Sequence, residues 1–430
     1  MKTLLFVGAG RHQRHAIRQA KLHGLRVLAV DQDPDALGLP EADRGFVVDF
    51  ADLDAVLAAV ADEPLDGVLT VSADRAVPVV AAVAEARGLP GIGTATAHLM
   101  THKVAMRRAL AEAGVPQPRF AALRLLSERH RAAAEVGFPA VLKPADSGGQ
   151  RGLFLVRSVD EIEAHLHETL SASPTQEAIL EQFVAGTEMN GIVIARPGEA
   201  RTQTHSDRLR PAGIGFGVGW IHVYPASAYG DQLAEADRIA ALTARTLGLK
   251  NGIAFPQLIA TPDGGVVVVE CAARIPGGQM ADLVRHAVGV DLIDVQIRIA
   301  LGEELPDELI TPRFRQPLAI RFLTASPGPL PTGRVTRIGS LDPVLSCPGV
   351  VQAGTYLTVG QVIEPVRLDG DRHGYVIAVA DTNLEALDRA EAAARLVDVE
   401  VEPETETETE TIAERRARLR QPGADPIDVE

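Results

Sequence analysis

A run of apolar residues ends in a glutamate, and an arginine follows four positions later. Residues 266–269 are all valine, Glu270 comes next, and Arg274 lies in the segment ECAARIPGG. A carboxylate at the end of a buried strand is suited to hold Mg²⁺ against phosphates. A nearby guanidinium can stabilise negative charge on a transferred phosphoryl group or on a tetrahedral oxyanion. The alternative interpretation is a structural ion pair between Glu270 and Arg274.

A second chemical signal is a glycine-rich turn between two short apolar segments, residues 140–143 and 153–156. Such a turn can fold over a triphosphate and offer it backbone N–H groups. Lys143 ends the first segment, where its ammonium can neutralise phosphate oxygens. The turn contains the further candidates Ser147, Gly148, Gly149, Arg151 and Gly152. Because a P-loop requires Gly-Lys-Ser/Thr at the start of a helix, this is not a P-loop, and a plain glycine-rich hairpin stays open.

An apolar segment with two glutamates is a candidate nucleoside site. The sequence LEQFV occupies residues 180–184, and Glu188 follows after a glycine. An adenine ring needs an apolar slot with a few polar groups at its edge. Glu181 can accept a hydrogen bond from the adenine amino group or from a lysine, and Glu188 can accept from ribose hydroxyls. Taken singly, each glutamate could equally be a solvated surface group.

These side chains need strands and helices to position them. The first hundred residues alternate between strands at 4–7, 26–30, 45–48 and 67–71 and helices at 11–23, 53–60 and 77–87. This alternation predicts a parallel sheet with helices on both faces. Farther along, one helix is expected over residues 97–113, and a hairpin around the turn PDGG leads into Glu270.

The turn after the first strand contains Gly8 and Gly10. His12 and Gln13 stand near the place where a dinucleotide-binding fingerprint would have its third glycine, so the fingerprint is incomplete. Asp31 ends the second strand and is either a ribose ligand or a turn residue. An NAD(P) oxidoreductase therefore stays open as one hypothesis, beside a glycine turn that only joins strand to helix.

Four motifs in sequence order resemble those of the ATP-grasp superfamily, most closely its carboxylate–amine ligases, which include the L-amino-acid ligases. They are THKVAMRRAL with Lys103, FPAVLKPADSGGQRG with Lys143, ILEQFVAGTE with Glu181 and Glu188, and VVECAARIPGG with Glu270 and Arg274. The resemblance covers roughly residues 1–300. It implies an α/β and α+β multidomain protein in which two α+β subdomains clasp ATP.

The expected parts run in order along the chain. They are an N-terminal Rossmann-like domain (residues 1–95), an ATP-grasp lid subdomain with a central helical linker (96–190), a catalytic subdomain (191–310), a mixed C-terminal α+β lobe (311–400) and an acidic tail (401–430). Residues 402–410 alternate Glu and Thr and cannot bury an apolar face, so this stretch is expected to be disordered.

The resemblance also implies roles for single residues. Lys103 and Lys143 contact the ATP phosphates or the adenine edge, and Lys143 also serves catalysis. The lid loop contains Ser147, Gly148, Gly149 and Gly152, the adenine hinge contains Glu181, Gln182, Phe183 and Val184, and Glu188 holds the ribose. Glu270 binds Mg²⁺, with Mn²⁺ as an alternative, between the β- and γ-phosphates. Arg274 steadies the acyl phosphate and the adduct formed from it.

Two positions depart from the family pattern. Related enzymes usually have an acidic residue where this chain has Gln257, and often Asn where it has Ala272. Gln257 can still offer a carbonyl oxygen, so it is included as a metal ligand beside Glu270. The site would then carry less negative charge, which leaves the number of metal ions open and supports a non-catalytic relative as an alternative.

The substrate-binding residues are expected in two places. In similar enzymes the segment equivalent to residues 204–227 lines the acceptor or acyl pocket, and here it contains Asp207, Arg208, Trp220 and His222. Ordinary packing of a loop is the alternative for these side chains. Gly277 and Gly278 precede a predicted helix and can offer backbone N–H groups to a substrate carboxylate.

Composition limits the other classes of function. The 430 residues are enough for two to four domains, and the net charge of −15 argues against general nucleic-acid or anionic-membrane binding. Cys271 and Cys347 lie in no metal-binding pattern and indicate a reducing compartment. The apolar run at residues 4–7 is too short for a signal peptide or a membrane span, so we expect a cytoplasmic protein.

The sequence thus predicts an ADP-forming ligase that joins a small carboxylic acid, such as an amino acid, to an amine through an acyl phosphate. A bicarbonate-dependent carboxylase with a biotin or nucleotide acceptor is the alternative within the superfamily. The small-molecule substrates stay unnamed, and a homodimer is a common arrangement in similar enzymes.

Overall fold

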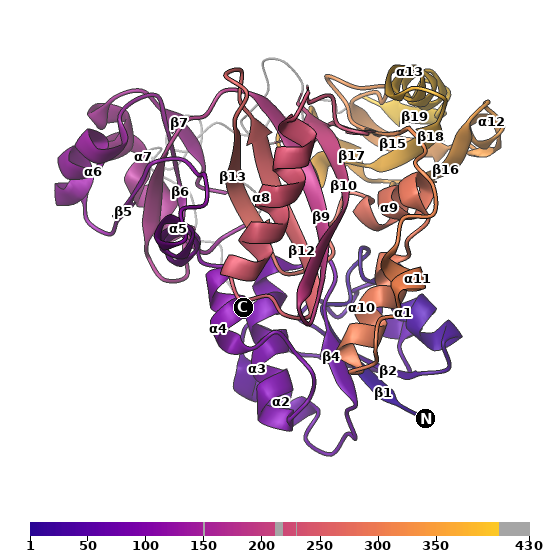
Figure 1. The fold of residues 1–430 in the computed structure, drawn as a ribbon. Helices are drawn as coiled ribbons and strands as arrows, with labels where there is room; N and C mark the ends of the chain where they lie inside the picture. The colour runs from indigo at the N-terminus through magenta and orange to yellow at the C-terminus, as the bar shows by residue number, and fades with distance from the viewer. Residues whose placement is uncertain (149–150, 211–217, 229, 404–430) are drawn as a thin grey trace, which may run out of the picture.

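Four sheets organise the chain in a computed structural model that describes residues 1–148, 151–210, 218–228 and 230–403. In Figure 1 the N-terminal domain lies at the bottom, the lid at the left and the C-terminal lobe at the upper right, around a long central sheet. No helix among these residues is both long and apolar enough to cross a membrane.

The N-terminal sheet is parallel, with strand order β3-β2-β1-β4. Its strands are β1 (Thr3–Val7), β2 (Arg26–Asp31), β3 (Arg44–Val47) and β4 (Gly67–Leu69). Alternate residues of each strand face opposite sides. One side packs against α1 (Arg14–Leu22) and against α10 (Leu292–Ala300), which comes from far along the chain. The other packs against α2 (Leu53–Ala59) and α3 (Val77–Arg87), so the predicted parallel sheet is confirmed.

The linker after this domain differs from the prediction. Instead of one helix over residues 97–113, the chain forms α4 (Thr94–Leu99) and α5 (Lys103–Glu112). His102 lies between them with extended backbone, and its Nδ1 accepts a hydrogen bond from the Ala105 N–H at 3.3 Å. A side chain that caps a new helix competes with continuation of the old one. The break matters because it makes Lys103 the first residue of α5.

The lid is a separate antiparallel sheet with strand order β5-β8-β6-β7. Its strands are β5 (Phe120–Leu123), β6 (Ala140–Pro144), β7 (Phe154–Val156) and β8 (Ala178–Gln182). Helices α6 (Arg129–Val136) and α7 (Val159–Ser171) cover one side and close an apolar core of their own. The glycine-rich turn joins β6 to β7, as the sequence predicts.

The central sheet has eight antiparallel strands in the order β13-β12-β9-β10-β11-β14-β18-β16. They are β9 (Thr187–Arg196), β10 (Glu199–Leu209), β11 (Ile221–Tyr224), β12 (Gly252–Ala260), β13 (Val266–Ala272), β14 (Leu318–Phe322), β16 (Val350–Thr355) and β18 (Gly374–Val379). The expected catalytic subdomain and C-terminal lobe therefore share one sheet. Strand β10 was not predicted, because its centre, QTHSD, is polar rather than alternating.

Helices cover both sides of this sheet. On one side lies α8 (Gln232–Thr246), and on the other lie α9 (Met280–Val288) and α10, whose core is continuous with that of the N-terminal domain. Helix α11 (Asp307–Ile310) ends the expected catalytic subdomain. The C-terminal lobe adds α12 (Asp342–Leu345), α13 (Asn383–Ala394) and a three-stranded sheet of β15 (Gly333–Ile338), β17 (Val362–Ile363) and β19 (Val399–Glu402). The rest of the predicted tail, residues 404–430, lies outside the described residues.

Candidate active site

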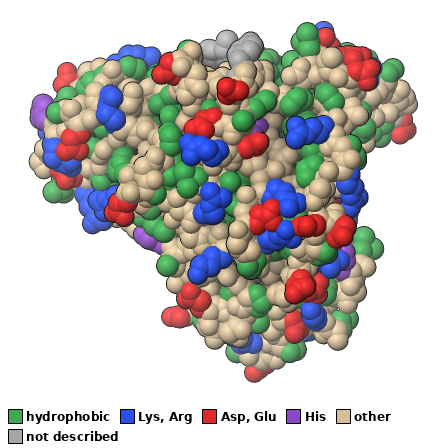
Figure 2. All heavy atoms as spheres, viewed as in Figure 1, with side chains coloured by type: hydrophobic (Ala, Val, Ile, Leu, Met, Phe, Trp, Pro, Cys, Tyr) green, Lys and Arg blue, Asp and Glu red, His purple; other side chains and the backbone are tan. Residues whose placement is uncertain are grey.

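A cavity of about 400 Å³ lies where the lid, the central sheet and the N-terminal domain meet. Figure 2 shows charged side chains of both signs interspersed over the outer surface, with no large area of one sign on that face. The predicted residues that line the cavity are Lys103, Lys143, Ser147, Gly148, Arg151, Glu181, Gln182, Phe183, Val184, Glu188, Arg208, His222, Gln257, Glu270, Arg274, Gly277 and Gly278. Lys143 and Glu270, which lie on different sheets, thus face one space.

The lid side of the cavity contains a buried chain of charges. Lys143 Nζ lies 2.8 Å from Glu181 Oε2, and Arg107 Nε donates to Glu181 Oε1 at 2.9 Å. Burial alone would raise the pKa of Glu181, but the two cations hold this pKa at about 2. Burial lowers the pKa of Lys143, against the opposing effect of Glu181. Glu181 thereby fixes the Lys143 ammonium at the cavity wall, where a phosphate can reach it.

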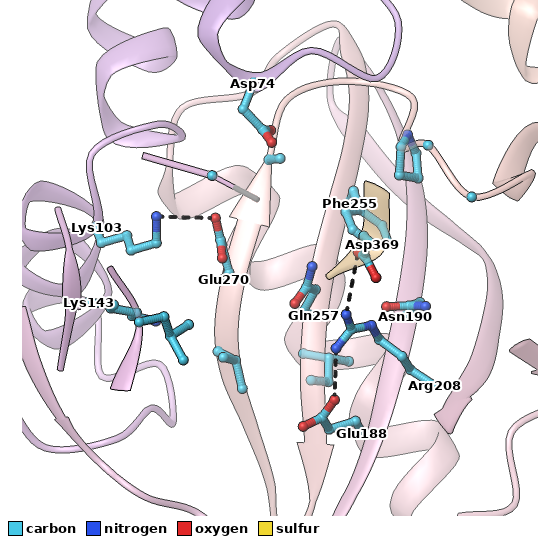
Figure 3. Close-up of a pocket in the computed structure, with 18 of the residues that line it drawn as sticks. Asp74, Lys103, Lys143, Glu188, Asn190, Arg208, Phe255, Gln257, Glu270 and Asp369 are labelled. Atoms are coloured by element: carbon cyan, nitrogen blue, oxygen red, sulfur yellow. Dashed lines mark hydrogen bonds and ion pairs between the residues drawn. The ribbon is translucent and has the colours of Figure 1, made fainter. Parts of the chain in front are cut away.

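Lys103 bridges the lid loop and the end of β13. Its Nζ donates to the Ser147 carbonyl at 2.8 Å and lies 3.6 Å from Glu270 Oε1. In Figure 3 the two lysines point from the left toward Glu270, which stands on β13. The loop and the carboxylate are therefore held near each other by one cation from the start of α5.

Three oxygen-bearing side chains stand in one row across the central sheet. Glu270 pairs with Gln257 on β12, and Gln257 pairs with Asn190 on β9. All three line the cavity, and Figure 3 shows Gln257 between the other two. Asn190 Oδ1 is buried and accepts no hydrogen bond from the described residues.

This row fits a magnesium ion that arrives with a nucleotide. Mg²⁺ is commonly held by one or two carboxylates together with substrate phosphates and water, rather than by an all-protein cage. Glu270 supplies the carboxylate and Gln257 an amide oxygen beside it. Within the described residues, no group of three or more His, Cys, Asp or Glu side chains could hold a metal without such help.

Arg274 is held by a residue that the sequence analysis did not identify. Its Nε and Nη2 donate to the two carboxylate oxygens of Asp74 at 2.6 and 2.7 Å. Its Nη1 is buried and donates to none of the described residues. Asp74 follows β4 at the edge where parallel strands end, which is where ligand-binding residues of such sheets gather. That position was the one signal that could have identified it.

The expected ribose ligand, Glu188, is engaged by arginines. Glu188 Oε2 lies 3.1 Å from Arg208 Nη1, and Glu188 Oε1 lies 2.8 Å from Arg210 Nη2. Arg208 Nη2 also lies 3.8 Å from Asp369 Oδ2, in the C-terminal lobe. Figure 3 shows Glu188, Arg208 and Asp369 on the side of the cavity opposite the lysines. A ribose would have to share Glu188 with these guanidinium groups.

Some candidates lie away from the cavity lining. Both oxygens of Asp207 accept from the Ser227 N–H, at 3.0 and 2.9 Å, and burial raises the pKa of this carboxyl. The Arg321 guanidinium packs on the Trp220 ring, with its Cζ atom 4.3 Å from the ring centre. Gly152 turns the lid hairpin at φ +66°, where its carbonyl accepts from the Thr169 hydroxyl. Gly149 lies outside the described residues.

The structure adds other residues that the sequence did not single out as cavity residues. His12, from the glycine turn, lines the cavity together with Asn190 and Arg372. Burial, with Arg11 and Arg372 nearby, lowers the pKa of His12 to about 4, so the ring is neutral at pH 7. These residues come from three separate parts of the chain, so no local motif connects them.

Two family models match the chain. Residues 102–308 match the carbamoyl-phosphate synthase L chain ATP binding domain, and residues 323–402 match the L-amino acid ligase C-terminal domain 2. Among curated relatives, the protein y4rH of Sinorhizobium fredii is 30% identical over 72% of this chain and 63% of its own length. The mitochondrial carbamoyl-phosphate synthase [ammonia] of Mus musculus is 25% identical over 55% of this chain and 16% of its own. The chain thus spans less than two thirds of these relatives.

Solved structures share the fold at low identity. The L-amino acid ligase from Bacillus licheniformis superposes with a TM-score of 0.79 at 19% identity, over 94% of this chain and 99% of that one. Phosphoribosylglycinamide synthetase from Anaerococcus prevotii gives 0.75 at 19% identity, over 93% and 100%. The predicted multidomain α/β and α+β architecture is therefore confirmed.

Proposed function

We propose that this chain, whose residues 102–308 match an ATP-grasp domain and whose residues 323–402 match the L-amino acid ligase C-terminal domain 2, is an ATP-dependent carboxylate–amine ligase. One observation supports this best: Lys143, Glu270 and Arg274 line one cavity beneath the glycine-rich lid turn. Lys143 lies on β6 of the lid, Glu270 lies on β13, and Arg274 follows β13. Their side chains have different chemistry, and together they match the needs of phosphoryl transfer followed by acyl transfer.

In the first step, a substrate carboxylate oxygen attacks the γ-phosphorus of ATP, and the bond to the β-phosphate oxygen breaks to release ADP. Lys143 and the lid N–H groups around Gly148 orient the γ-phosphate. Residues 182–184 and the apolar wall at Val141 and Leu153 offer the adenine slot. Glu270 and Gln257 would hold Mg²⁺, which would supply positive charge to neutralise the phosphates of ATP.

In the second step, the amine nitrogen attacks the carbonyl carbon of the acyl phosphate. The carbon–oxygen bond to phosphate breaks, phosphate leaves, and the nitrogen loses a proton. Arg274 Nη1, which no described residue engages, is available to donate to the oxyanion. The other two guanidinium nitrogens stay on Asp74, so the donor is fixed in direction before substrate arrives.

The lid turn also limits access of water to the intermediate. A Cβ added at Gly148 would lie 3.2 Å from Asp74 Oδ2, so the turn lies against the N-terminal domain. Exclusion of water protects an acyl phosphate from hydrolysis. The substrates are, in this proposal, amino acids or other small carboxylic acids and amines.

The test is ADP release with ATP, Mg²⁺ and mixed amino acids. Lys143→Ala and Glu270→Ala should each remove activity, whereas the exposed controls Lys250→Ala and Glu304→Ala should keep it. If Lys143→Ala and Glu270→Ala still form ADP, the proposed active site is wrong. Turnover that needs bicarbonate but no amino acid would indicate the carboxylase alternative. ATP binding without turnover on a broad panel would indicate a nucleotide-binding relative, consistent with Gln257 in place of an acid.

A further inference from the structure

Strand β13 contains one extra residue immediately before Glu270. Gln257 of β12 pairs with Glu270, whereas the next residue of β12, Leu258, pairs with Val268, so the register skips Val269. Two residues of β13 therefore stand opposite one residue of β12, which is the arrangement of a β-bulge. Bulges of this kind redirect the side chains that follow them, so the bulge at Val269 bears directly on where Glu270 points.

The bulge decides which side of the central sheet Glu270 faces. Val266 and Val268 belong to the apolar core shared with α8, and side chains along a regular strand alternate between the two faces. Strict alternation would therefore place Glu270 in that apolar core. After the bulge the order is reversed, because Cys271 belongs to the core whereas Glu270 and Ala272 line the cavity. The one-residue shift thus turns the carboxylate out of the core and toward the cavity.

A buried arginine holds the backbone of this bulge. Strand β13 is the edge strand of the central sheet, and Arg107 of α5 lies against its outer edge. Arg107 Nη1 donates to the Val268 carbonyl at 3.2 Å, and Arg107 Nη2 donates to the Val269 carbonyl. Consecutive carbonyls of a regular strand point to opposite edges, and the bulge brings both within reach of one guanidinium. The Val268 N–H donates to the Pro116 carbonyl at 3.0 Å, so the edge is covered by protein at this point.

The same guanidinium is bound to the lid. Arg107 Nε donates to Glu181 Oε1 at 2.9 Å, and Glu181 Oε2 lies 2.8 Å from Lys143 Nζ. The Arg107 side chain is 1% exposed, and each of its three nitrogens donates to a protein oxygen. Arg107 is not among the described residues that line the cavity, so its guanidinium acts on the site only through the groups that it holds.

The helix that carries Arg107 also carries Lys103. The two residues are four positions apart on α5, and residues at this spacing share one face of a helix. Lys103 Nζ lies 3.6 Å from Glu270 Oε1, while Arg107 holds the two carbonyls that immediately precede Glu270. Helix α5 thus contacts both the side chain of Glu270 and the backbone that aims it.

We propose that Arg107 is a positioning residue, which aims Glu270 at the cavity by holding the β13 bulge and places Lys143 beside it through Glu181. The inference rests on the proposed ligase function, because Lys143 and Glu270 are the groups that would act on the phosphates of ATP and on Mg²⁺. One guanidinium then fixes the lid cation and the sheet carboxylate relative to each other. Residues that support a metal ligand in this way typically change metal affinity or activity 10- to 100-fold when they are replaced.

The experiment compares wild type with Arg107→Lys in ADP release and in calorimetry of ADP binding with and without Mg²⁺. Lysine keeps a cation for Glu181, but its single nitrogen cannot also reach both bulge carbonyls. We expect Arg107→Lys to raise the Mg²⁺ concentration for half-maximal activity about 10- to 100-fold and to lose most of the gain in ADP affinity that Mg²⁺ gives wild type. Arg108→Lys is the matched control, since Arg108 is the exposed neighbour on the same helix. If Arg107→Lys does not fold, Arg107→Met combined with Glu181→Gln leaves no unpaired carboxylate, and Glu181→Gln alone is its reference.

The outcomes separate this inference from the ligase proposal. A variant with a lower melting temperature but the Mg²⁺ requirement of wild type would show that Arg107 is structural only, which overturns the positioning role and leaves the ligase standing. If no pair of substrates yields ADP, the ligase proposal fails, and calorimetry then tests Arg107 by itself. A gain in ADP affinity from Mg²⁺ that Arg107→Lys loses would support the positioning role. The same gain in both proteins, or no gain in wild type, would overturn it.

Discussion

Arg274 donates two hydrogen bonds to Asp74, at 2.6 and 2.7 Å, and so joins the end of β13 to the edge of the N-terminal sheet. Burial alone would raise the pKa of Asp74, but Arg274 outweighs it and holds the pKa below its ordinary value. The pair is therefore ionised at neutral pH. The N-terminal domain, which offers no complete dinucleotide fingerprint, instead positions the residue proposed to stabilise the oxyanion.

Asp74→Asn should lower kcat with little change in the KM for ATP, because Arg274 loses its carboxylate partner while the amide, which has nearly the same shape, preserves the contact with the lid turn at Gly148. We expect a loss of about 100-fold, the effect of misplacing a catalytic group by about 1 Å. Steady-state ADP release measures both parameters, and the exposed Asp35→Asn is the matched control. A parallel rise in KM for ATP with unchanged kcat would contradict the positioning role.

Glu181→Gln should destabilise the lid by about 3–5 kcal/mol, because Arg107 and Lys143 would remain buried without their carboxylate. Glu181 has a pKa of about 2 when folded, below its ordinary value of 4.5. Its contribution is thus fully present above pH 4.5 and is lost as the pH falls toward 2. Urea unfolding at pH 7, 5 and 3 should show wild type losing more stability on acidification than the variant. Equal losses would exclude Glu181 as a source of acid sensitivity.

Gln257→Glu should lower the Mg²⁺ concentration needed for half-maximal activity by roughly tenfold, because a second carboxylate would stand beside Glu270. Titration of ADP release with Mg²⁺ measures this, with Gln176→Glu as a control at an exposed glutamine. An unchanged Mg²⁺ requirement would place the ion away from β12.

Gly186→Ala should destabilise the chain and weaken nucleotide binding. Gly186 has φ +154°, and a Cβ there would lie 2.3 Å from the Ala260 carbonyl, so β9 and β12 would have to separate near Glu188. Gly198 also has positive φ, +82°, but an added Cβ meets nothing within 4 Å. Gly198→Ala should therefore cost only backbone strain, about 1–2 kcal/mol, and Gly186→Ala a further 1–3 kcal/mol from overpacking. Similar denaturation midpoints for the two variants would count against the close approach.

Local patterns predicted the parts of the site that lie on single elements. Lys143 and Glu270 lie near the ends of apolar strands, and each strand is bounded by a recognisable turn, so periodicity was sufficient to place them. Helix α3 matches its predicted span because Gly88 ends it with φ +63°. The break at His102 was missed because a capping histidine is not a usual helix stop.

Contacts between distant segments could not be read from the chain. Asp74 meets Arg274 across 200 residues, and Arg372 approaches Gly278 from another lobe. The centre of strand β10 is polar yet buried, because β10 lies between β9 and β11 in the central sheet. In each case the determining factor is tertiary packing, which leaves no periodic signature in a single sequence.

Strand β14 lies between β11 and β18, so residues 318–322 complete the hydrogen bonding of the sheet that carries Glu270. A version of the chain that stops before residue 318 would leave β11 as an unpaired edge strand, which could then pair with strands of other molecules. Exchanging the last hundred residues with those of a relative is the safer manipulation, because it preserves that edge. Such chimaeras would exchange most of the C-terminal lobe while leaving residues 102–308, which match the ATP binding domain, unchanged.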